Sequence, residues 1–206
     1  IRERATTYDG DAVITHGVVT ARYYSYFTLQ DGNGTWSGVW ARGLAAPSVG
    51  DSVTIRGTVT ESDGINSGCT FIVSAVVESI STAATMPDPT VVSSIALSSE
   101  DYEGVLVKVE SGECTNPTLG SGEWEINDGS GAGRVDDLGY AFTPILGTAY
   151  DVTGPLLYRE SNFKLEPRDA GDIVWVSDGA APELFQVYAA DGTTVIVTFS
   201  EDVDET

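Results

Sequence analysis

The chain has 206 residues, of which 41% are apolar, so it is long enough for one or two domains with hydrophobic cores. Its formal net charge is −21, with 10 lysines and arginines against 31 aspartates and glutamates, which argues against direct binding of nucleic acid through phosphate contacts. No segment approaches the roughly 18 apolar residues that span a bilayer, so we expect no membrane insertion.

The first half of the chain predicts five β-strands. Runs rich in Val, Thr and Tyr alternate with turns that contain Gly, Asn, Asp or Pro, and no convincing helical pattern interrupts them. The predicted strands cover residues 11–22, 24–30, 36–40, 52–60 and 70–79. Five short strands in this order are typical of a small Greek-key barrel, the OB-fold.

The second half predicts the same number of strands. A connector rich in Ser, Thr and Pro, residues 81–93, leads to a short helical turn that we expect near residues 98–102. The strands that follow are predicted at residues 105–114, 123–127, 133–138, 149–157 and 162–167. The whole chain is therefore expected to be all-β.

The two halves share an internal repeat with a period of 97 residues. The segment SYFTLQDGNG, residues 25–34, aligns without a gap with GEWEINDGSG, residues 122–131, and Gly57 aligns with Gly154. A fixed internal period indicates a repeated structural unit. We therefore predict two tandem five-stranded OB-fold-like barrels, with Gly57 and Gly154 at equivalent bends.

Several segments resemble a known group of repeats. DGNGTWSGVW, SVGDSVTIRGTV, GEWEINDGSG and NFKLEPRDAGDI are similar to the tandem OB-fold repeats of secreted multidomain bacterial proteins, over roughly residues 9–173. Such repeats accompany extracellular nuclease, lamin-tail-like and Ig-like domains. The resemblance implies an extracellular or cell-surface location and an accessory role, because the catalytic motifs of the nuclease domain have no counterpart here.

The C-terminal segment has a different character. Residues 183–189 and 194–200 predict two strands around an Asp-Gly turn and resemble the opening hairpin of a bacterial Ig-like module. An Ig-like sandwich needs about 100 residues, so we expect this module to be incomplete. Its missing strands come either from a continuation of the chain or from a neighbouring subunit, which would link copies into a filament.

The expected domain organisation follows from these patterns. Residues 1–88 form a first OB-fold-like barrel with its connector, residues 89–176 form a second one, and residues 177–206 form the opening hairpin of an Ig-like domain.

No catalytic constellation is evident. His16 lies in a predicted strand without a nucleophile elbow to serve. The carboxylate pairs Glu123/Glu125 and Asp136/Asp137 have the composition that glycosidases use. Glu123 and Glu125, however, alternate with a tryptophan, so we expect them on a solvated strand face. We therefore expect no enzyme activity within this chain.

Two turns have the composition of weak calcium sites. Asp31 and Asn33 in one turn, and Asp128 and Ser130 in the other, place oxygen atoms two residues apart around glycines. Tight turns need these same residues for their own geometry. Both interpretations stay open, and neither turn matches an EF-hand. Zinc is not expected, because the chain has one histidine and no Cys-x-x-Cys.

Cysteines and aromatic residues give two further expectations. Cys69 and Cys114 are the only cysteines, and in a secreted chain we expect them to form a disulfide. Strand alternation places Phe27, Leu29 and Val39 in the core. It leaves Tyr24, Tyr26 and Trp36 as candidates for an exposed ligand face. Because of the negative charge, a neutral carbohydrate or a protein partner suits such a face better than nucleic acid.

These observations predict a non-catalytic structural, assembly or binding module of a secreted or surface-displayed bacterial protein, with self-association into filaments as one form of assembly. The alternative is an accessory substrate-binding region of an extracellular nuclease or other hydrolase whose catalytic domain lies elsewhere.

Overall fold

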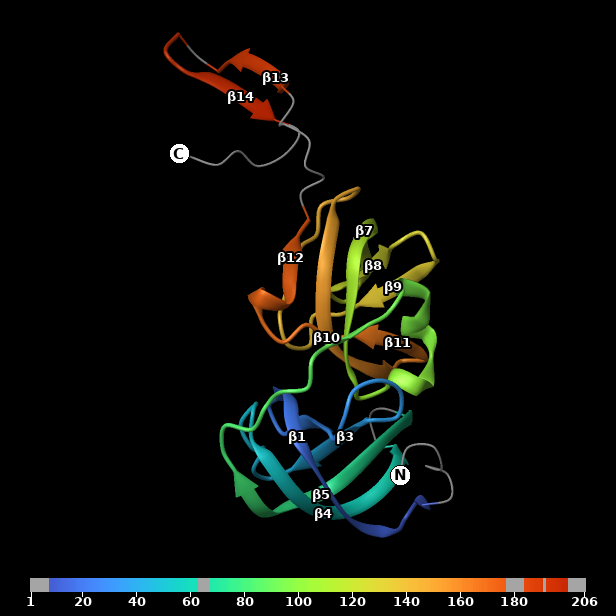
Figure 1. Cartoon of the computed structure of the whole chain (residues 1–206). Coiled ribbons are helices and arrows are strands. Elements are labelled where there is room, and N and C mark those ends of the chain that lie inside the picture. Colours follow the sequence, from blue (N-terminus) through green and yellow to red (C-terminus); the bar gives the residue numbers. More distant parts are fainter. Residues whose placement is uncertain (1–7, 63–66, 177–183, 191, 200–206) are drawn as a thin grey trace. The chain divides into compact units, whose positions relative to one another are not determined.

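The computed structural model describes residues 8–62, 67–176, 184–190 and 192–199. The fold is all-β, as predicted, with a few short 3-10 helices among the described residues. The chain divides into two compact units, Ile1–Val176 and Ser177–Thr206. Figure 1 shows the strands of the larger unit in two groups, which we call the first lobe (β1–β5) and the second lobe (β6–β12).

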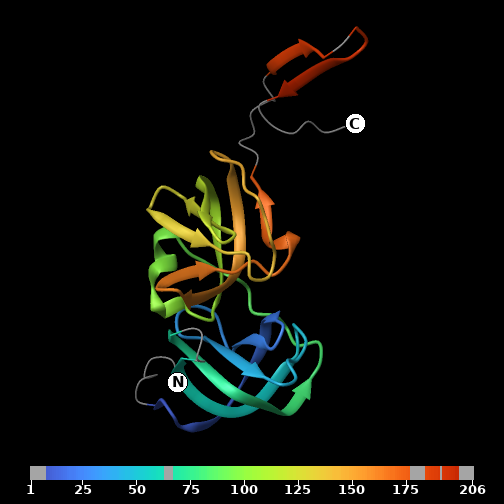
Figure 2. The ribbon, with the colours of Figure 1, turned by 180° about the vertical axis from the view of Figure 1, so that it is seen from behind.

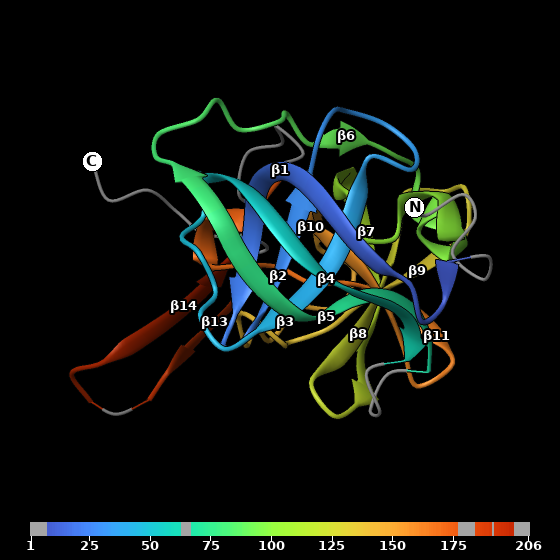
Figure 3. The ribbon, with the colours of Figure 1, turned by 90° about the horizontal axis from the view of Figure 1, so that it is seen from below.

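The first lobe is a closed five-stranded barrel in the order β1-β2-β3-β5-β4. All neighbouring strands are antiparallel except β3 and β5, which are parallel. Figure 3 shows the long strands β4 and β5 side by side across this barrel. The strands are β1 (Ala12–Tyr23), β2 (Tyr26–Gln30), β3 (Gly38–Gly43), β4 (Ser52–Ser62) and β5 (Ser67–Ser81).

Strand alternation sets the core of this barrel. Phe27, Leu29 and Val39 point inward with Val53 and Ile55, and each is at most 8% exposed. The prediction that Phe27, Leu29 and Val39 lie in the core is therefore confirmed. Burial of apolar side chains at alternate positions of each strand is what holds a small barrel closed.

The second lobe is a seven-stranded sheet in the order β12-β10-β11-β9-β8-β7-β6, with an additional pairing between β10 and β7. Because of this additional pairing, strands β7, β8, β9, β11 and β10 pair in succession and the last pairs with the first. The strands are β6 (Thr90–Val91), β7 (Leu106–Gly120), β8 (Glu123–Asn127), β9 (Ala132–Val135), β10 (Ala149–Arg159), β11 (Asn162–Leu165) and β12 (Ile173–Trp175).

Three 3-10 helices complete the second lobe: η2 (Ser94–Ser98), η3 (Glu100–Tyr102) and η4 (Ala170–Asp172). The helical turn predicted near residues 98–102 corresponds to the end of η2 and to η3. Figure 2 shows η2 and η3 (green) on the side of the lobe where β9 lies (yellow), and η2 packs on β9.

The repeat is visible in the strand positions. β2 and β8 begin at residues 26 and 123, and β4 and β10 begin at residues 52 and 149, so both pairs are 97 residues apart. Gly57 and Gly154 are each the sixth residue of an 11-residue strand. At Gly57 a Cβ atom would collide with Ile72 of β5, and at Gly154 it would collide with the backbone of Glu166, directly after β11.

The two lobes differ at their last strand. β5 is one continuous strand of 15 residues, whereas in the second lobe β11 ends at Leu165 and β12 starts at Ile173. Pro167 lies in the gap and has no backbone N–H to donate to a ladder. The segment then turns through η4 before it rejoins the sheet beside β10.

The smaller unit contains one antiparallel hairpin, β13 (Leu184–Ala189) and β14 (Val195–Phe199). Several of its apolar side chains are exposed, with Leu184 and Val195 both at 61%. Val187 and Val197 are paired across the strands and are also exposed. Within the described residues of this smaller unit, nothing covers these apolar side chains.

Candidate functional site

The outer face of β2 and β3 in the first lobe lies against the second lobe. Thr28, Gln30 and Trp40 point away from the barrel core, yet each is at most 1% exposed. The Trp40 indole Nε1 donates a hydrogen bond to the Leu156 carbonyl at 2.9 Å. The backbone N–H of Leu106 donates to Gln30 Oε1, also at 2.9 Å.

Further contacts extend this interlobe interface. Trp40 packs with Tyr23, Cys69, Phe71 and Leu157 in one buried cluster that contains residues of both lobes. The Tyr23 hydroxyl donates to the Glu166 carbonyl at 2.7 Å, and Arg168 Nη1 donates to the Thr20 carbonyl at 3.0 Å. A face that small barrels of this kind use for ligands is therefore filled in the first lobe by its own neighbour.

The three candidate ligand-face aromatics do not share one surface. Tyr24 is 89% exposed and occupies the tight turn between β1 and β2 with a positive φ of 56°. Tyr26 is half-buried, with its ring 6.0 Å from that of Phe71 and with Arg42 above it at 5.4 Å. Trp36 is half-buried and lines a small pocket together with His16.

The predicted disulfide is absent, and this prediction is wrong. Cys69 and Cys114 are both buried, and no disulfide joins them. Cys69 belongs to the interlobe cluster, whereas Cys114 lies in the core of the second lobe. Each thiol is thus a small apolar side chain in a different core. The expectation rested on the presence of two cysteines in a chain that resembles secreted proteins, but the two side chains are buried in separate clusters.

The corresponding face of the second lobe carries charged residues. Glu123 and Glu125 on β8 take the positions that Tyr26 and Thr28 hold on β2. Beside them is a pocket of about 460 Å³, with the rings of Tyr158 and Phe163 4.8 Å apart in its wall. Its polar lining includes Glu125, Arg134, Ser161 and Asn162. This face is therefore a candidate ligand surface that the sequence analysis did not identify.

A buried cluster of charged side chains around Lys164 includes Glu123 of this face. Lys164 is 1% exposed and its ammonium contacts Glu123, Asp136 at 3.3 Å and Glu160 at 2.8 Å. Burial alone would lower the pKa of Lys164, but hydrogen bonds to Glu123 and Glu160 outweigh this and raise it. Burial would also raise the pKa of Glu123, but hydrogen bonds to Lys164 and Arg134 lower it.

The ion cluster corrects one expectation. Glu123 does not lie on a solvated face, because it is 6% exposed and paired with two cations. Glu125 is half-exposed, and the Thr115 hydroxyl donates a hydrogen bond to it. The cations hold Glu123 in its ionised form, which is the opposite of what a general acid needs.

Glu166 is the most unusual titratable group. It is fully buried, and neither carboxyl oxygen makes a hydrogen bond of good geometry within the described structure. Burial, followed by repulsion from Asp136, raises the pKa of Glu166 well above its ordinary value. The fold therefore favours the protonated carboxyl at this position, directly beside the interlobe contact of Tyr23.

The second of the two calcium-like turns is closed by the protein itself. Asp128 accepts hydrogen bonds from the hydroxyl of Ser94 at 2.7 Å and from the N–H of Ser130 at 3.0 Å. Hydrogen bonds from Ser130 and Ser94 lower the pKa of Asp128. Within the described residues, no group of three or more His, Cys, Asp or Glu side chains could hold a metal ion.

Comparison with protein-family models, with curated proteins and with solved structures gives no significant match to this chain. In the described part of the chain, no helix is long and apolar enough to cross a membrane.

Proposed function

We propose that this chain is a non-catalytic structural module of a secreted or surface-displayed bacterial protein, in which two tandem OB-fold barrels act as one rigid support. The observation that carries the proposal is the buried outer face of β2 and β3. Its largest side chain, Trp40, is 1% exposed and is hydrogen-bonded to the other lobe. Because this face of the first barrel packs against the second lobe, it holds the two lobes together and is not open to a ligand.

The second OB-fold barrel in this proposal rests on two facts. The ring of pairings from β7 to β10 has the same order as β1-β2-β3-β5-β4, including one parallel pair, β9 with β11. The 97-residue offset relates the starts of β2 and β8, and those of β4 and β10. A repeated unit that shares an interface with its neighbour is stabilised by that interface as well as by its own core.

The hairpin gives the module its assembly role. An isolated two-stranded hairpin is marginal in water, and its free edges invite pairing with another strand. Leu184, Val187 and Val195 are exposed, and burial of these apolar side chains by further strands would stabilise the hairpin. We infer that further strands of an Ig-like sandwich supply this burial. In this proposal the strands belong to the same polypeptide. The alternative outcome of the test is that a second copy supplies them, which would produce filaments.

The test compares the full chain with a chain that ends at Val176, by sedimentation velocity and negative-stain electron microscopy. We expect both to be monomeric and to have the same unfolding transition for the lobes. Filaments of the full chain that dissolve on truncation would favour completion by a second copy. Turnover of DNA or of a polysaccharide by the purified chain would contradict the non-catalytic role.

The second candidate function is an accessory binding region of an extracellular hydrolase. It is favoured by the pocket beside Tyr158 and Phe163, because ligand pockets combine aromatic walls with a few polar groups. The paired variant Tyr158→Ala/Phe163→Ala tests it. Loss of binding to the substrate of the linked enzyme, with the fold intact, would favour this function over a purely structural one.

A further inference from the structure

The repeat provides an internal comparison between two equivalent turns. Asp31 and Asp128 each start an Asp-Gly-x-Gly turn and lie 97 residues apart. In the second lobe, the Ser94 hydroxyl lies 2.7 Å from the Asp128 carboxylate and 2.6 Å from the Gly131 carbonyl, and these two acceptors share its single proton. The Asp128 N–H donates back to that hydroxyl at 3.0 Å. Together with Ser130, the Ser94 hydroxyl therefore supplies the hydrogen-bond partners of the Asp128 carboxylate in this turn.

In the first lobe, the backbone of the turn is held firmly, but its carboxylate is unused. The Asp31 N–H donates to the Ser37 carbonyl at 3.1 Å, and the Ser37 hydroxyl donates to the Gly34 carbonyl at 2.8 Å. The Trp36 N–H donates to the Asp101 carbonyl at 2.8 Å. The Asp31 carboxylate makes no hydrogen bond or ion pair with any of the residues that the structure describes.

This open turn borders two adjoining pockets. A pocket of about 430 Å³ lies between β1, the turn and the connector, and a smaller one of about 70 Å³ lies beside Trp36. His16 and Asp31 line both. Asn33 and Asp88 line the larger one, and their side chains, like that of His16, make no hydrogen bond to the described residues.

Trp36 is held in an unusual conformation at this place. It has a positive φ of 63°, which is uncommon for a residue with a bulky side chain. Such conformations persist where the surrounding structure fixes them, and they are concentrated at binding and catalytic sites. The bond from its N–H to Asp101 fixes this one. The aromatic side chain is thus positioned at a pocket with uncommitted polar groups.

We propose that this turn pocket of the first lobe binds a neutral carbohydrate. Sugar hydroxyls donate to carboxylates and accept from amide and imidazole N–H groups, and Asp31, Asn33 and His16 offer these partners. The Ser94 hydroxyl shows which chemical group the equivalent turn accepts. Neither pocket is lined by a lysine or arginine, and Asp31 and Asp88 would repel an anion.

The proposal is independent of the rigid-support role. The turn pocket does not include the outer face of β2 and β3 that the second lobe covers, apart from Gln30 at its edge. A neutral sugar is a better occupant than a metal ion, because the described residues contain no group of three or more His, Cys, Asp or Glu side chains that could hold one. The site also differs from the pocket at Tyr158 and Phe163, which gives the experiment an internal reference.

The experiment titrates the isotope-labelled full chain with cellopentaose, mannopentaose and maltopentaose at millimolar concentration and follows its amide NMR spectrum. We expect at least one of these probes to shift the signals of His16, residues 31–37 and residues 85–88. Because a hydrogen bond to a charged group contributes about 1.5–3 kcal/mol, Asp31→Asn is expected to weaken binding about tenfold or more.

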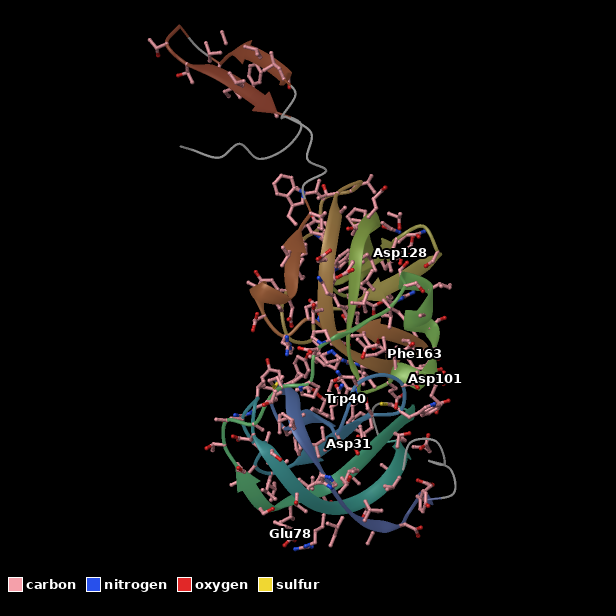
Figure 4. The ribbon with its side chains drawn as sticks, in the orientation of Figure 1. Asp31, Trp40, Glu78, Asp101, Asp128 and Phe163 are labelled. Carbon is pink, nitrogen blue, oxygen red and sulfur yellow. The ribbon has the colours of Figure 1, made fainter. Side chains whose placement is uncertain are left out.

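The matched control is Glu78→Gln, which removes one negative charge from the same lobe. Glu78 lies on β5 and lines neither pocket; Figure 4 labels both residues. The control is expected to bind as the parent does. No shifts with any of the three probes would overturn the proposal, as would shifts confined to the pocket at Tyr158 and Phe163. Equal affinity of Asp31→Asn and the parent would also overturn it.

Discussion

The indole of Trp40 in the first lobe donates a hydrogen bond to the carbonyl of Leu156 in the second, and both residues are at most 1% exposed. Trp40 lies on the outer face of β3, where a barrel of this type would otherwise present it to solvent or ligand. Its ring also stacks with Tyr23 at 5.8 Å between centroids. Figure 4 shows Trp40 among the side chains where the two lobes meet.

The first prediction concerns Trp40 itself. Trp40→Ala removes a fully buried aromatic side chain and leaves the Leu156 carbonyl without its partner. We expect the free energy of unfolding to fall by about 3–5 kcal/mol, measured by urea denaturation. Tyr24→Ala is the control: because Tyr24 is 89% exposed, we expect a change within about 0.5 kcal/mol. Similar losses for the two variants would contradict this account.

The two repeat glycines should respond alike. A Cβ atom at Gly57 would collide with β5, and one at Gly154 would collide with the segment directly after β11; backbone atoms are among the nearest at both sites. We expect Gly57→Ala and Gly154→Ala each to lower the melting temperature. Gly32→Ala should be tolerated, since its nearest atom lies 4.0 Å away and its φ is not positive. A tolerated Gly154→Ala would show that the equivalence of these strands is superficial.

Glu166 predicts a pH dependence of stability. Its pKa in the folded protein is raised by burial, so the folded state holds the proton more tightly than the unfolded state does. Stability from this group is fully present below its unfolded pKa of about 4.3 and declines as the pH rises through the folded value. Glu166→Gln should remove this decline, so the variant should gain stability over the parent as the pH rises. Parallel stability–pH curves would refute the assignment.

Both cysteines should react as thiols once the chain is unfolded, because no disulfide joins them. In denaturant without reductant, we expect two equivalents of thiol per chain by reaction with Ellman's reagent, and an intact mass without the loss of two hydrogens. In the folded protein both should react slowly, because Cys69 and Cys114 are 0% exposed. If the unfolded protein contained no reactive thiol, the two cysteines would form a disulfide after all, and this account would be wrong.

The strand pattern could be predicted because alternation is a local property of the sequence, and the repeat could be predicted because the sequence itself displays it. Alternation of apolar residues placed Phe27 and Leu29 inward, and the 97-residue offset located β8 and β10. The interlobe interface could not be predicted, because nothing in a strand's own sequence says that Trp40 faces another lobe rather than water. The same limit explains Glu123: its burial depends on Lys164, which is 41 residues away in sequence.

Cooperative unfolding tests the rigid support most directly. Differential scanning calorimetry of the full chain should show one main transition for Ile1–Val176, with the calorimetric enthalpy equal to the van't Hoff enthalpy, because the lobes share the buried cluster around Trp40. Trp40→Ala should broaden or split this transition. Two separate transitions in the parent chain, unchanged by Trp40→Ala, would show that the lobes are independent and would contradict the proposed rigid support.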